Sequence, residues 1–349
     1  MADTAGTLPP RRPTGRDVAQ LAGVSQATVS LVFSGAEAGH RVSEATRQRV
    51  LEAARGLGYR PQAAGRQLRL GRSGMAMLAV PNLQGPFFGR VLAGVHEEAA
   101  RHGLSVVVSS GWSAATLAEA ATTSRFDGLL ICSPDDGQLG ELPPGTPAVF
   151  LDADPAAAGG APTVELDLAG GMAAAVAHLT GLGHRRLGRL RSAHSAYTFR
   201  VRQAAFEKAA AGLAVTECSV SLNRGESAAR AVATELLGRP DRPHAVVCDD
   251  DVVASGVYQA AADLGLRIPA DVSVVGIDNI SVAALLTPPL TTVDLPGEQL
   301  GRTGVAALAA LLAGRQVEPE PPLATRLLVR SSTTAASTTA ASTAGGSGA

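Results

Sequence analysis

Residues 16–33, RDVAQLAGVSQATVSLVF, constrain the fold more than any other stretch of the chain. Two short helical patterns meet at Gly23: the first buries Val18 and its small neighbours, and the second starts at Ser25. Gly23 can adopt the positive φ needed to leave the first helix, and the Ser25 hydroxyl can accept a hydrogen bond from a free amide that opens the second. Two short helices joined by such a turn predict a helix-turn-helix.

The second helix of the pair presents an outward face of small, hydroxyl and amide side chains, while Val24, Val29 and Val32 fall on its inner side. In the major groove of DNA a glutamine can pair with adenine and an apolar group can contact a thymine methyl, so this face suits base reading. A plain helical hairpin within a core is the alternative interpretation. The candidate DNA contacts of this helix are Ser25, Gln26, Ala27, Thr28, Ser30 and Leu31.

The charge of the chain is split between its two ends. Residues 1–72 hold eleven Arg and no Lys against five acidic residues, a net charge of +6, whereas the remaining 277 residues carry 19 basic and 26 acidic groups, a net of −7. A protein that binds DNA through one end needs positive charge only at that end, to neutralise phosphates. The basic first end therefore predicts an affinity for DNA that falls steeply with salt. A solvated charged surface would not explain why the sign changes at one place.

A third helical pattern completes the basic head. Ser43 can cap it, and Pro61 ends the unit. The apolar side chains that close a three-helix core are Val50, Leu51, Ala54, Leu57 and Tyr59. We therefore assign residues 14–60 to a small all-α helix-turn-helix headpiece and residues 61–73, which carry the basic run PQAAGRQLRLGR, to a linker or hinge helix.

The body of the chain, residues 74–330, is long enough for two lobes of ordinary domain size. Short apolar runs such as MAMLAV, LSVVVS, DGLLIC and PAVFL alternate with helical patterns, and the alternation resumes at LGRL, AVVC and DVSVVGI. Strands separated by helices imply parallel sheets. The tail, residues 331–349, is Ser, Thr, Ala and Gly without periodicity and is expected to be disordered.

No catalytic, metal or cofactor site can be read from the chain. The seven histidines have no close ligand pairing and the three cysteines lack a C-x-x-C spacing, so no metal site is predicted. No P-loop, nucleophile elbow or dinucleotide fingerprint appears, which argues against an enzyme and against a cofactor. The odd cysteine count, with neither a secretory leader nor an apolar run of spanning length, predicts a protein of the reducing cytoplasm without a membrane partner.

The order of these elements resembles the lactose/galactose-repressor (LacI/GalR) family of bacterial transcription regulators. The headpiece signature D-V-A-x-x-A-G-V-S-x-x-T-V-S matches residues 17–30, and the third-helix signature V-S-x-x-T-R-x-R-V matches residues 42–50. The hinge signature P-N-x-x-A-R-x-L matches Pro61, Arg66 and Leu68. In the body the resemblance extends through PNLQGPFFGRVLAGV, RFDGLLI, HLTGLGHRRLGRL and VSVVGIDN.

The resemblance implies a two-lobed α/β effector domain like a periplasmic binding protein (type I), with parallel sheets and a ligand cleft between the lobes. It also implies a hinge that folds into a helix across a dimer on DNA, where Leu68 wedges into the minor groove beside Arg66. An ordinary contact between domains is the alternative for Leu68. Gln62 and Gly65 depart from the family's Asn and Ala in the hinge, and Leu31 replaces a polar or basic reader. A glycine costs a helix on the order of 1 kcal/mol, so this hinge is expected to order less readily.

The same resemblance implies that the effector is bound by Phe87, Phe88, Arg202, Asp250 and Asp278. Sugar hydroxyls both donate and accept hydrogen bonds, so an arginine fork opposite carboxylates suits a polyol. Asp250 stands where the family has Asn, so the ligand of this chain cannot be inferred from the ligands of the family. Three alternatives stay open. Arg202 and Asp278 form only a structural bridge, residues 249–251 are a solvated helix start, or the two phenylalanines belong only to the core.

These features predict a homodimeric repressor that binds a palindromic double-stranded DNA operator under the control of a small-molecule effector, a sugar or a derivative of one. Two headpieces on a two-fold axis are needed because a single headpiece reads too few base pairs. The effector would close the lobes and change the ordering of the hinge, with induction and corepression both open. A sugar-binding protein of transport type and a carbohydrate-metabolising enzyme are the alternatives. We expect the protein in the cytoplasm, associated with the nucleoid.

Overall fold

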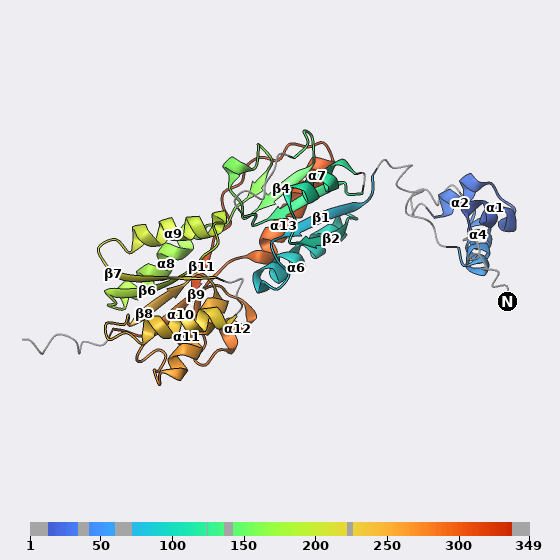
Figure 1. The fold of residues 1–349 in the computed structure, drawn as a ribbon. Coiled ribbons are helices and arrows are strands. Elements are labelled where there is room, and N and C mark those ends of the chain that lie inside the picture. The colour runs from blue at the N-terminus through green and yellow to red at the C-terminus, as the bar shows by residue number, and fades with distance from the viewer. Residues whose placement is uncertain are drawn as a thin grey trace, which may run out of the picture. The chain divides into compact units, whose positions relative to one another are not determined.

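The computed structural model describes residues 13–33, 42–59, 72–123, 125–135, 142–221 and 226–336. The chain divides into two compact units, residues 1–73 and 74–349. The first unit contains the basic headpiece and the second contains the two-lobed body (Figure 1). Residues 60–71, which contain most of the predicted hinge (61–73) including Arg66 and Leu68, lie outside the described residues.

The headpiece consists of the helices α1 (Gly15–Ala22), α2 (Gln26–Val32) and α4 (Glu44–Leu57). Thr14 forms a capping box with Asp17 at the start of α1, and Ser25 and Ser43 cap the other two helices. Gly23 ends α1 with a φ of 63°, which frees the chain to turn into α2. The buried core of the headpiece is Val18, Ala19, Ala22, Val29, Val50, Ala53 and Ala54. The predicted helix-turn-helix is therefore confirmed, with the third helix closing its core.

The first lobe of the body is a parallel sheet with helices on both faces. Its strand order is β2-β1-β3-β4-β5, from β1 (Met75–Val80), β2 (Ser105–Ser110), β3 (Gly128–Cys132), β4 (Ala148–Leu151) and β5 (Thr163–Val164). Leu78 and Val80 of β1 pack toward α6 (Pro86–Arg101) and α13 (Gly297–Leu312), whereas Met77 and Ala79 pack toward α7 (Ala114–Thr122). A short 3-10 turn, η1 (Pro155–Ala157), follows β4. Successive apolar residues of β1 therefore point to opposite faces of the sheet and pack against the helices on each face.

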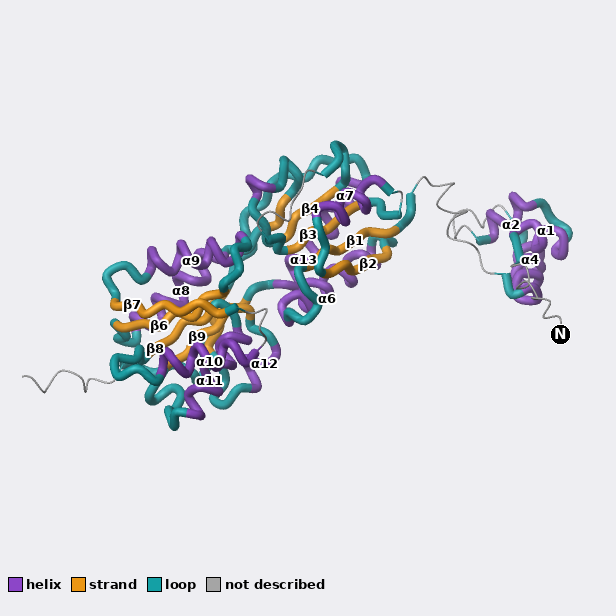
Figure 2. Tube along the Cα trace, viewed as in Figure 1, coloured by secondary structure: helices purple, strands orange, loops and turns teal. Residues whose placement is uncertain are grey.

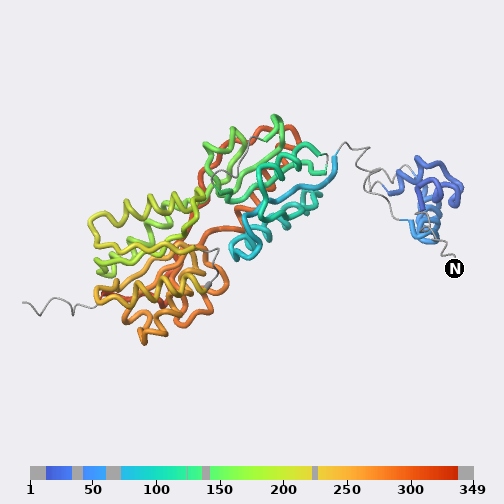
Figure 3. The backbone as a smooth tube through the Cα atoms, viewed as in Figure 1, coloured from blue at the N-terminus to red at the C-terminus, as the bar shows by residue number. Residues whose placement is uncertain are grey.

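The helices α6 and α13 lie side by side although some 200 residues separate them in sequence (Figure 3). Glycines allow this close approach. A Cβ on Gly94 would meet the backbone oxygen of Glu298 at 1.9 Å, and one on Gly301 would meet the backbone oxygen of Val91 at 2.2 Å. Because both obstacles are backbone atoms, neither could move aside without shifting a helix.

The second lobe is a six-stranded sheet in the order β11-β10-β9-β8-β6-β7 (Figure 2). Its strands are β6 (Arg186–Ser192), β7 (Ala214–Val220), β8 (Ala245–Cys248), β9 (Ser273–Asp278), β10 (Thr291–Asp294) and β11 (Arg326–Leu328), of which β11 alone pairs antiparallel. One face packs on α8 (Leu168–Gly181) and α9 (Tyr197–Ala209), and the other on α10 (Glu226–Leu237) and α11 (Asp251–Asp263). The short helix α12 (Ser281–Leu285) follows β9.

The chain crosses between the lobes three times, between β5 and α8, between β10 and α13, and between α13 and β11. Figure 3 shows the late, orange-to-red part of the chain returning to the first lobe as α13. The predicted arrangement of a small helical headpiece followed by a two-lobed α/β body with parallel sheets is confirmed. Within the described residues, no helix is both long enough and apolar enough to span a membrane.

The segment 331–336 corrects the boundary of the predicted disordered tail. Ser332 is fully buried, and its hydroxyl donates to the Val274 carbonyl and accepts from the Thr291 amide. The Ala336 amide donates to the Leu182 carbonyl at 2.8 Å. The polar, aperiodic composition of this segment predicted disorder. The prediction was wrong because the segment is ordered by hydrogen bonds to strands that are distant in the sequence. Residues 337–349 lie outside the described residues.

Candidate functional sites

The predicted DNA-reading residues lie on one helix, α2, and its cap. Gln26, Ala27 and Ser30 are exposed, and Leu31 is half-buried. The Ser25 hydroxyl accepts from the Thr28 amide at 3.1 Å and lies 2.9 Å from the Thr28 hydroxyl. The outward face of α2 is therefore free of the headpiece core, which argues against the plain buried hairpin.

The second candidate site lies where the carboxyl ends of strands from both lobes meet, and we call it the lobe junction. Its side chains come from the ends of β3, β4, β8 and β9, from α9 and from the start of α11 (Asp251–Asp263). We define it by the following residues: Ser133, Asp152, Thr198, Arg202, Asp249, Asp250, Asp251 and Asp278. Carboxyl ends of parallel strands are the usual place for ligands in open α/β sheets.

Arg202 occupies the centre of the lobe junction. Its side chain is buried, and its guanidinium donates to the backbone oxygen of Asp249 and, at 3.4 Å, to Oδ1 of Asp278. The same group stacks over the Phe199 ring, 5.3 Å from its centroid. The structural bridge between Arg202 and Asp278 therefore exists in this structure. A bridge of this kind also holds the fork of the arginine in place for a ligand.

The acidic run 249–251 starts a helix, α11, as one alternative predicted, but it is buried rather than solvated. Asp250 caps α11 by accepting from the Val253 amide at 2.6 Å. Asp251 accepts from the Thr292 hydroxyl at 2.6 Å and from the Ile280 amide at 2.9 Å. Each carboxylate is no more than 8% exposed, so each is held by specific donors rather than by water.

Asp249 has its own partners within the second lobe. It pairs with the buried guanidinium of Arg189 and accepts from the Ser192 amide at 2.6 Å. The charge of Asp249 is therefore compensated by a neighbouring arginine, unlike the other carboxylates of the run.

Burial raises the pKa of several of these carboxyl groups. It raises the pKa of Asp251 to about 7, against hydrogen bonds from Thr292 and Ile280 that lower it. Burial also raises the pKa of Asp250, and that of Asp278 well above its ordinary value even though Arg202 opposes the shift. The lobe junction thus holds more buried carboxylates than it has cations to stabilise them.

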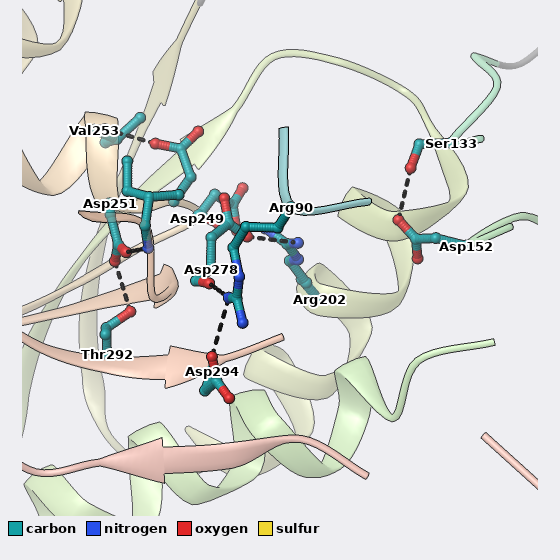
Figure 4. Close-up of polar contacts among 12 residues, drawn as sticks. Arg90, Ser133, Asp152, Arg202, Asp249, Asp251, Val253, Asp278, Thr292 and Asp294 are labelled. Atoms are coloured by element: carbon teal, nitrogen blue, oxygen red, sulfur yellow. Dashed lines mark hydrogen bonds and ion pairs between the residues drawn. The ribbon is translucent and has the colours of Figure 1, made fainter. Parts of the chain in front are cut away.

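Asp152 belongs to this site although the sequence analysis did not select it. It is 3% exposed and accepts from the Ser133 hydroxyl at 2.8 Å. Burial raises its pKa to about 6, opposed mainly by Arg202. The buried hydroxyl of Thr198 lies beside this carboxyl and also opposes the shift, but no well-formed hydrogen bond reaches Oδ1 of Asp152 or Oγ1 of Thr198 within the described part of the chain. Figure 4 shows Asp152 and Ser133 across from Arg202.

Backbone strain marks the same place. Among the described residues, the positive-φ positions other than glycine are Ser133, Asp152, Asp278 and Asn279, with φ values of 44°, 49°, 108° and 53°. Non-glycine residues persist in this region only when surrounding contacts hold them, and they cluster at functional sites. All four lie at the ends of β3, β4 and β9; three of them belong to the lobe junction and Asn279 follows directly after Asp278, which supports a functional role for this site.

Arg90 is a second residue that the sequence analysis missed. It lies on α6 of the first lobe, and its guanidinium donates to the backbone oxygen of Asp278 at 2.9 Å and to Oδ1 of Asp294 at 3.0 Å (Figure 4). Asn279 donates to the same carboxylate at 2.9 Å. Arg90 therefore links the first lobe to the backbone of Asp278, a candidate effector-binding residue of the second lobe. The only sequence signal was its place just after the P-F-F motif.

The two phenylalanines of that motif differ. Phe87 is 8% exposed and belongs to the core that α6 shares with α13, so it fills a structural role. Phe88 is half-buried and packs edge-on against Phe87, with ring centroids 5.7 Å apart. Only Phe88 retains surface that a ligand could contact.

Two further features bear on ligands. The described residues contain no group of three or more His, Cys, Asp or Glu side chains arranged to hold a metal ion. A hollow of about 500 Å³ lies between β5, α13 and the segment 316–323, apart from the residues of the lobe junction.

Known proteins resemble the chain along nearly its whole length. A family model described as bacterial regulatory proteins, lacI family, matches residues 14–62, and one described as a periplasmic binding protein-like domain matches residues 176–333. The HTH-type transcriptional repressor CytR of Escherichia coli (strain K12) is 31% identical over 336 residues, which cover 92% of this chain and 96% of CytR. The chain belongs to the lacI family.

Solved structures agree with this assignment. A lac repressor dimer bound to operator and the anti-inducer ONPF matches with a TM-score of 0.80 and 28% identity, covering 93% of this chain and all of that one. A complex of the transcriptional regulator CelR with cellobiose matches with a TM-score of 0.65 and 28% identity, covering 92% and 100%. This lacI-family protein is a DNA-binding repressor under effector control, and CytR, PurR and the lac repressor, which it resembles, are all repressors by name.

Proposed function

We propose that this lacI-family protein represses transcription as a homodimer on a palindromic operator, and that a small polyol bound at the lobe junction controls its affinity for DNA. The observation that carries the proposal is the strained, buried polar cluster of the lobe junction in a chain that also holds an exposed recognition helix. A two-lobed body without a ligand site would need no such cluster, because buried unpaired polar groups destabilise a fold.

In this proposal α2 enters the major groove. Gln26 reads adenine, Ala27 and Leu31 contact thymine methyl groups, and the hydroxyl side chains of the helix contact either phosphates or base edges. The lac repressor structure bound to operator is a dimer, and its similarity supports a dimeric arrangement here. Two headpieces on one axis would read half-sites about one helical turn apart or a multiple of it.

The proposed effector site uses side chains from both lobes. Asp152 from the first lobe and Asp278 and Asp250 from the second flank the Arg202 fork, and Phe88 supplies an apolar surface. Carboxylates accept from ligand hydroxyls while the guanidinium donates to ligand oxygens. The CelR structure contains cellobiose, which supports a hydroxyl-rich effector for this protein as well.

Coupling between the two sites would pass through the position of the lobes. A ligand that binds Asp152 and Asp278 at once favours one relative position, and Arg90 transmits the position of the Asp278 backbone to α6. The hinge residues Arg66 and Leu68, which lie outside the described residues, would then order or release on DNA. This is linkage through a body with two states. The proposed place of action is the nucleoid in the cytoplasm.

The experiment that tests the function is selection of genomic DNA fragments by the purified full chain at moderate salt, followed by sequencing. Recovery of a palindrome with a flexible pyrimidine-purine step at its centre is the expected result. Recovery of random fragments only would contradict sequence-specific repression. Genes beside the recovered sites would then identify candidate effectors.

Leu68→Ala tests the proposed minor-groove wedge. Specific binding should weaken far more than non-specific binding, because an apolar wedge stabilises only the bent operator complex. Equal losses of the two would contradict the wedge. Leu70→Ala in the same segment is the matched control, measured by mobility shift at several salt concentrations.

A further inference from the structure

We propose that the effector of this protein carries a positively charged nitrogen, as an amino sugar does, and is neither a neutral nor a phosphorylated sugar. The inference rests on the proposed function, because it concerns the ligand of the same lobe junction. It goes further by assigning that ligand a charge.

The balance of charge at the lobe junction is the first observation. Three buried carboxylates, Asp152, Asp250 and Asp278, lie around one cation, Arg202. Three other carboxylates nearby are already held: Asp249 pairs with Arg189, Asp294 pairs with Arg90 at 3.0 Å, and Asp251 accepts hydrogen bonds from Thr292 and Ile280. Burial opposes the ionisation of all three carboxyl groups, and a bound cation would stabilise their charged forms.

Unpartnered buried atoms supply the second observation. Oδ1 of Asp152 and Oγ1 of Thr198 belong to side chains that are 3% and 5% exposed, and neither atom has a hydrogen-bond partner in the described part of the chain. Both lie beside Arg202, which influences the Asp152 carboxyl electrostatically. A carboxylate oxygen can only accept, so Asp152 needs a donor, and the Thr198 hydroxyl beside it supplies only part of that need. Nε of Arg202 is also buried without a partner in the described part of the chain, and it needs an acceptor such as a sugar hydroxyl. An ammonium group offers three donors and no acceptor.

Asp250 sharpens the choice of ligand. One of its oxygens accepts from the Val253 amide at 2.6 Å, so the residue keeps its capping role. Asn, which the LacI/GalR pattern has at this position, could cap the helix equally well and still donate to a ligand hydroxyl through its amide. Ionised Asp250 cannot donate. The substitution therefore removes a donor for neutral hydroxyls and adds an acceptor for a cation.

The three carboxylates do not form a metal site, since no cluster able to hold a metal ion exists among the described residues. An organic cation fits better, because it can spread its contacts between Asp152 of the first lobe and Asp250 and Asp278 of the second. A phosphorylated sugar would add negative charge to a site that already has an excess of it. Such a ligand should be the weakest binder.

Calorimetric titration of the full chain with matched sugars tests the inference. The pairs are glucosamine with glucose, galactosamine with galactose, and mannosamine with mannose, and glucose 6-phosphate is added as the anionic probe. At about pH 6.5 the amines are largely protonated. We expect at least one amino sugar to bind about ten-fold or more tightly than its neutral partner, as one favourable buried charge contact would give.

Asp250→Asn is the decisive variant, and Asp263→Asn at the other end of α11 is its matched control. Asp263 is paired with Arg230 at 2.7 Å on the surface, away from the lobe junction. The first variant should lose most of the preference for the amino sugar and the second should keep it. Thermal unfolding of both variants establishes that each is folded before titration.

Equal or tighter binding of every neutral partner, or no binding of any amino sugar, would overturn the inference. So would a preference that persists unchanged in Asp250→Asn. These outcomes are separate from failure of the proposed function, which the selection of DNA fragments measures without any ligand. If the protein recovers a palindrome but binds a neutral sugar best, the proposal of a charged effector is contradicted and the proposal of a repressor is still supported.

Discussion

The headpiece and the lobe junction are held together over very different distances along the chain. In the headpiece, Thr14 bonds to Asp17, and Ser25 and Ser43 each bond to the residue three positions later. At the lobe junction, 76 residues separate Arg202 from Asp278, and 204 separate Arg90 from Asp294. Local contacts make an element whose surface can vary independently of the rest of the fold. Long-range contacts make a site whose members depend on one another.

This difference matters for function. A recognition helix must tolerate new side chains as operators change, so its reading face should contribute little to folding. An effector site that moves two lobes must resist one arrangement and favour another, so its groups should couple strongly. Each of the following changes tests whether the two regions really differ in this way.

Removal of Arg202 should have the largest effect. Arg202→Ala leaves Asp278 and Asp152 buried without their shared cation, and breaking a buried pair in this way costs about 3–5 kcal/mol. The loss should shrink as the pH falls, because both carboxyl groups can then take up a proton. Urea unfolding of the full chain at acidic and at neutral pH measures both effects.

Arg200→Ala on the same helix is the matched control for that measurement. Arg200 pairs with Asp154 at 3.2 Å, and its side chain is 44% exposed. An exposed pair contributes at most about 1 kcal/mol. If the two variants cost the same, the lobe junction is no more strongly coupled than the surface, and the comparison fails.

The same contrast in contact distance decides what the sequence could predict. The helix-turn-helix could be predicted because Gly23, Ser25 and the valines that follow are close in sequence and form their turn, cap and core through local contacts. Arg202 and Asp278 came from a resemblance to a family, not from spacing. Asp152 and Arg90 carried no local signal, because an aspartate after a strand and an arginine on a helix are ordinary until the fold brings them together. Order in the segment 331–336 was missed for the same reason.

A titration of stability tests the buried carboxylates. The folded-state pKa of Asp251 is raised from 3.8 to about 7, so its protonated form favours folding and the free energy of unfolding should fall as the pH rises from about 4 to 7. Asp251→Asn is uncharged throughout; its amide oxygen can accept from the Ile280 amide, and its NH2 group can donate to the Thr292 hydroxyl, which then acts as acceptor. Its Tm should therefore decline less over that range.

Asp152 and Asp278 keep their raised pKa values in this variant, so some slope should remain. Each kcal/mol corresponds to about 2–4 °C in Tm for a unit of this size. Calorimetric scans at several pH values, with Asp263→Asn as an exposed control, give the comparison. Parallel curves for Asp251→Asn and the unaltered protein would show that burial of Asp251 does not govern the pH dependence.

Helix contact in the first lobe allows a cleaner separation of local from long-range effects. Gly94→Ala adds a Cβ 1.9 Å from the Glu298 backbone oxygen, and overpacking of this kind costs about 1–3 kcal/mol or more. Gly89→Ala lies on the same helix with nothing within 4 Å of the new Cβ. It should stabilise the protein by about 0.5–1 kcal/mol through helix propensity alone. Denaturant unfolding should therefore give opposite signs, and stabilisation by both substitutions would show that helix propensity outweighs the contact between α6 and α13.

The smallest expected effect belongs to the headpiece. Ser25→Ala removes the acceptor for the Thr28 amide and should destabilise α2 by about 1 kcal/mol, whereas Ser25→Gly should cost only a few tenths. Hydrogen exchange of the full chain, read by mass spectrometry, measures this directly: amides of α2 should exchange about five times faster in the alanine variant. Because the cap is a local contact, exchange in the body should not change. Faster exchange at β8 or β9 would mean that the two regions are coupled through the fold even without DNA, and the independence of the recognition helix would have to be abandoned.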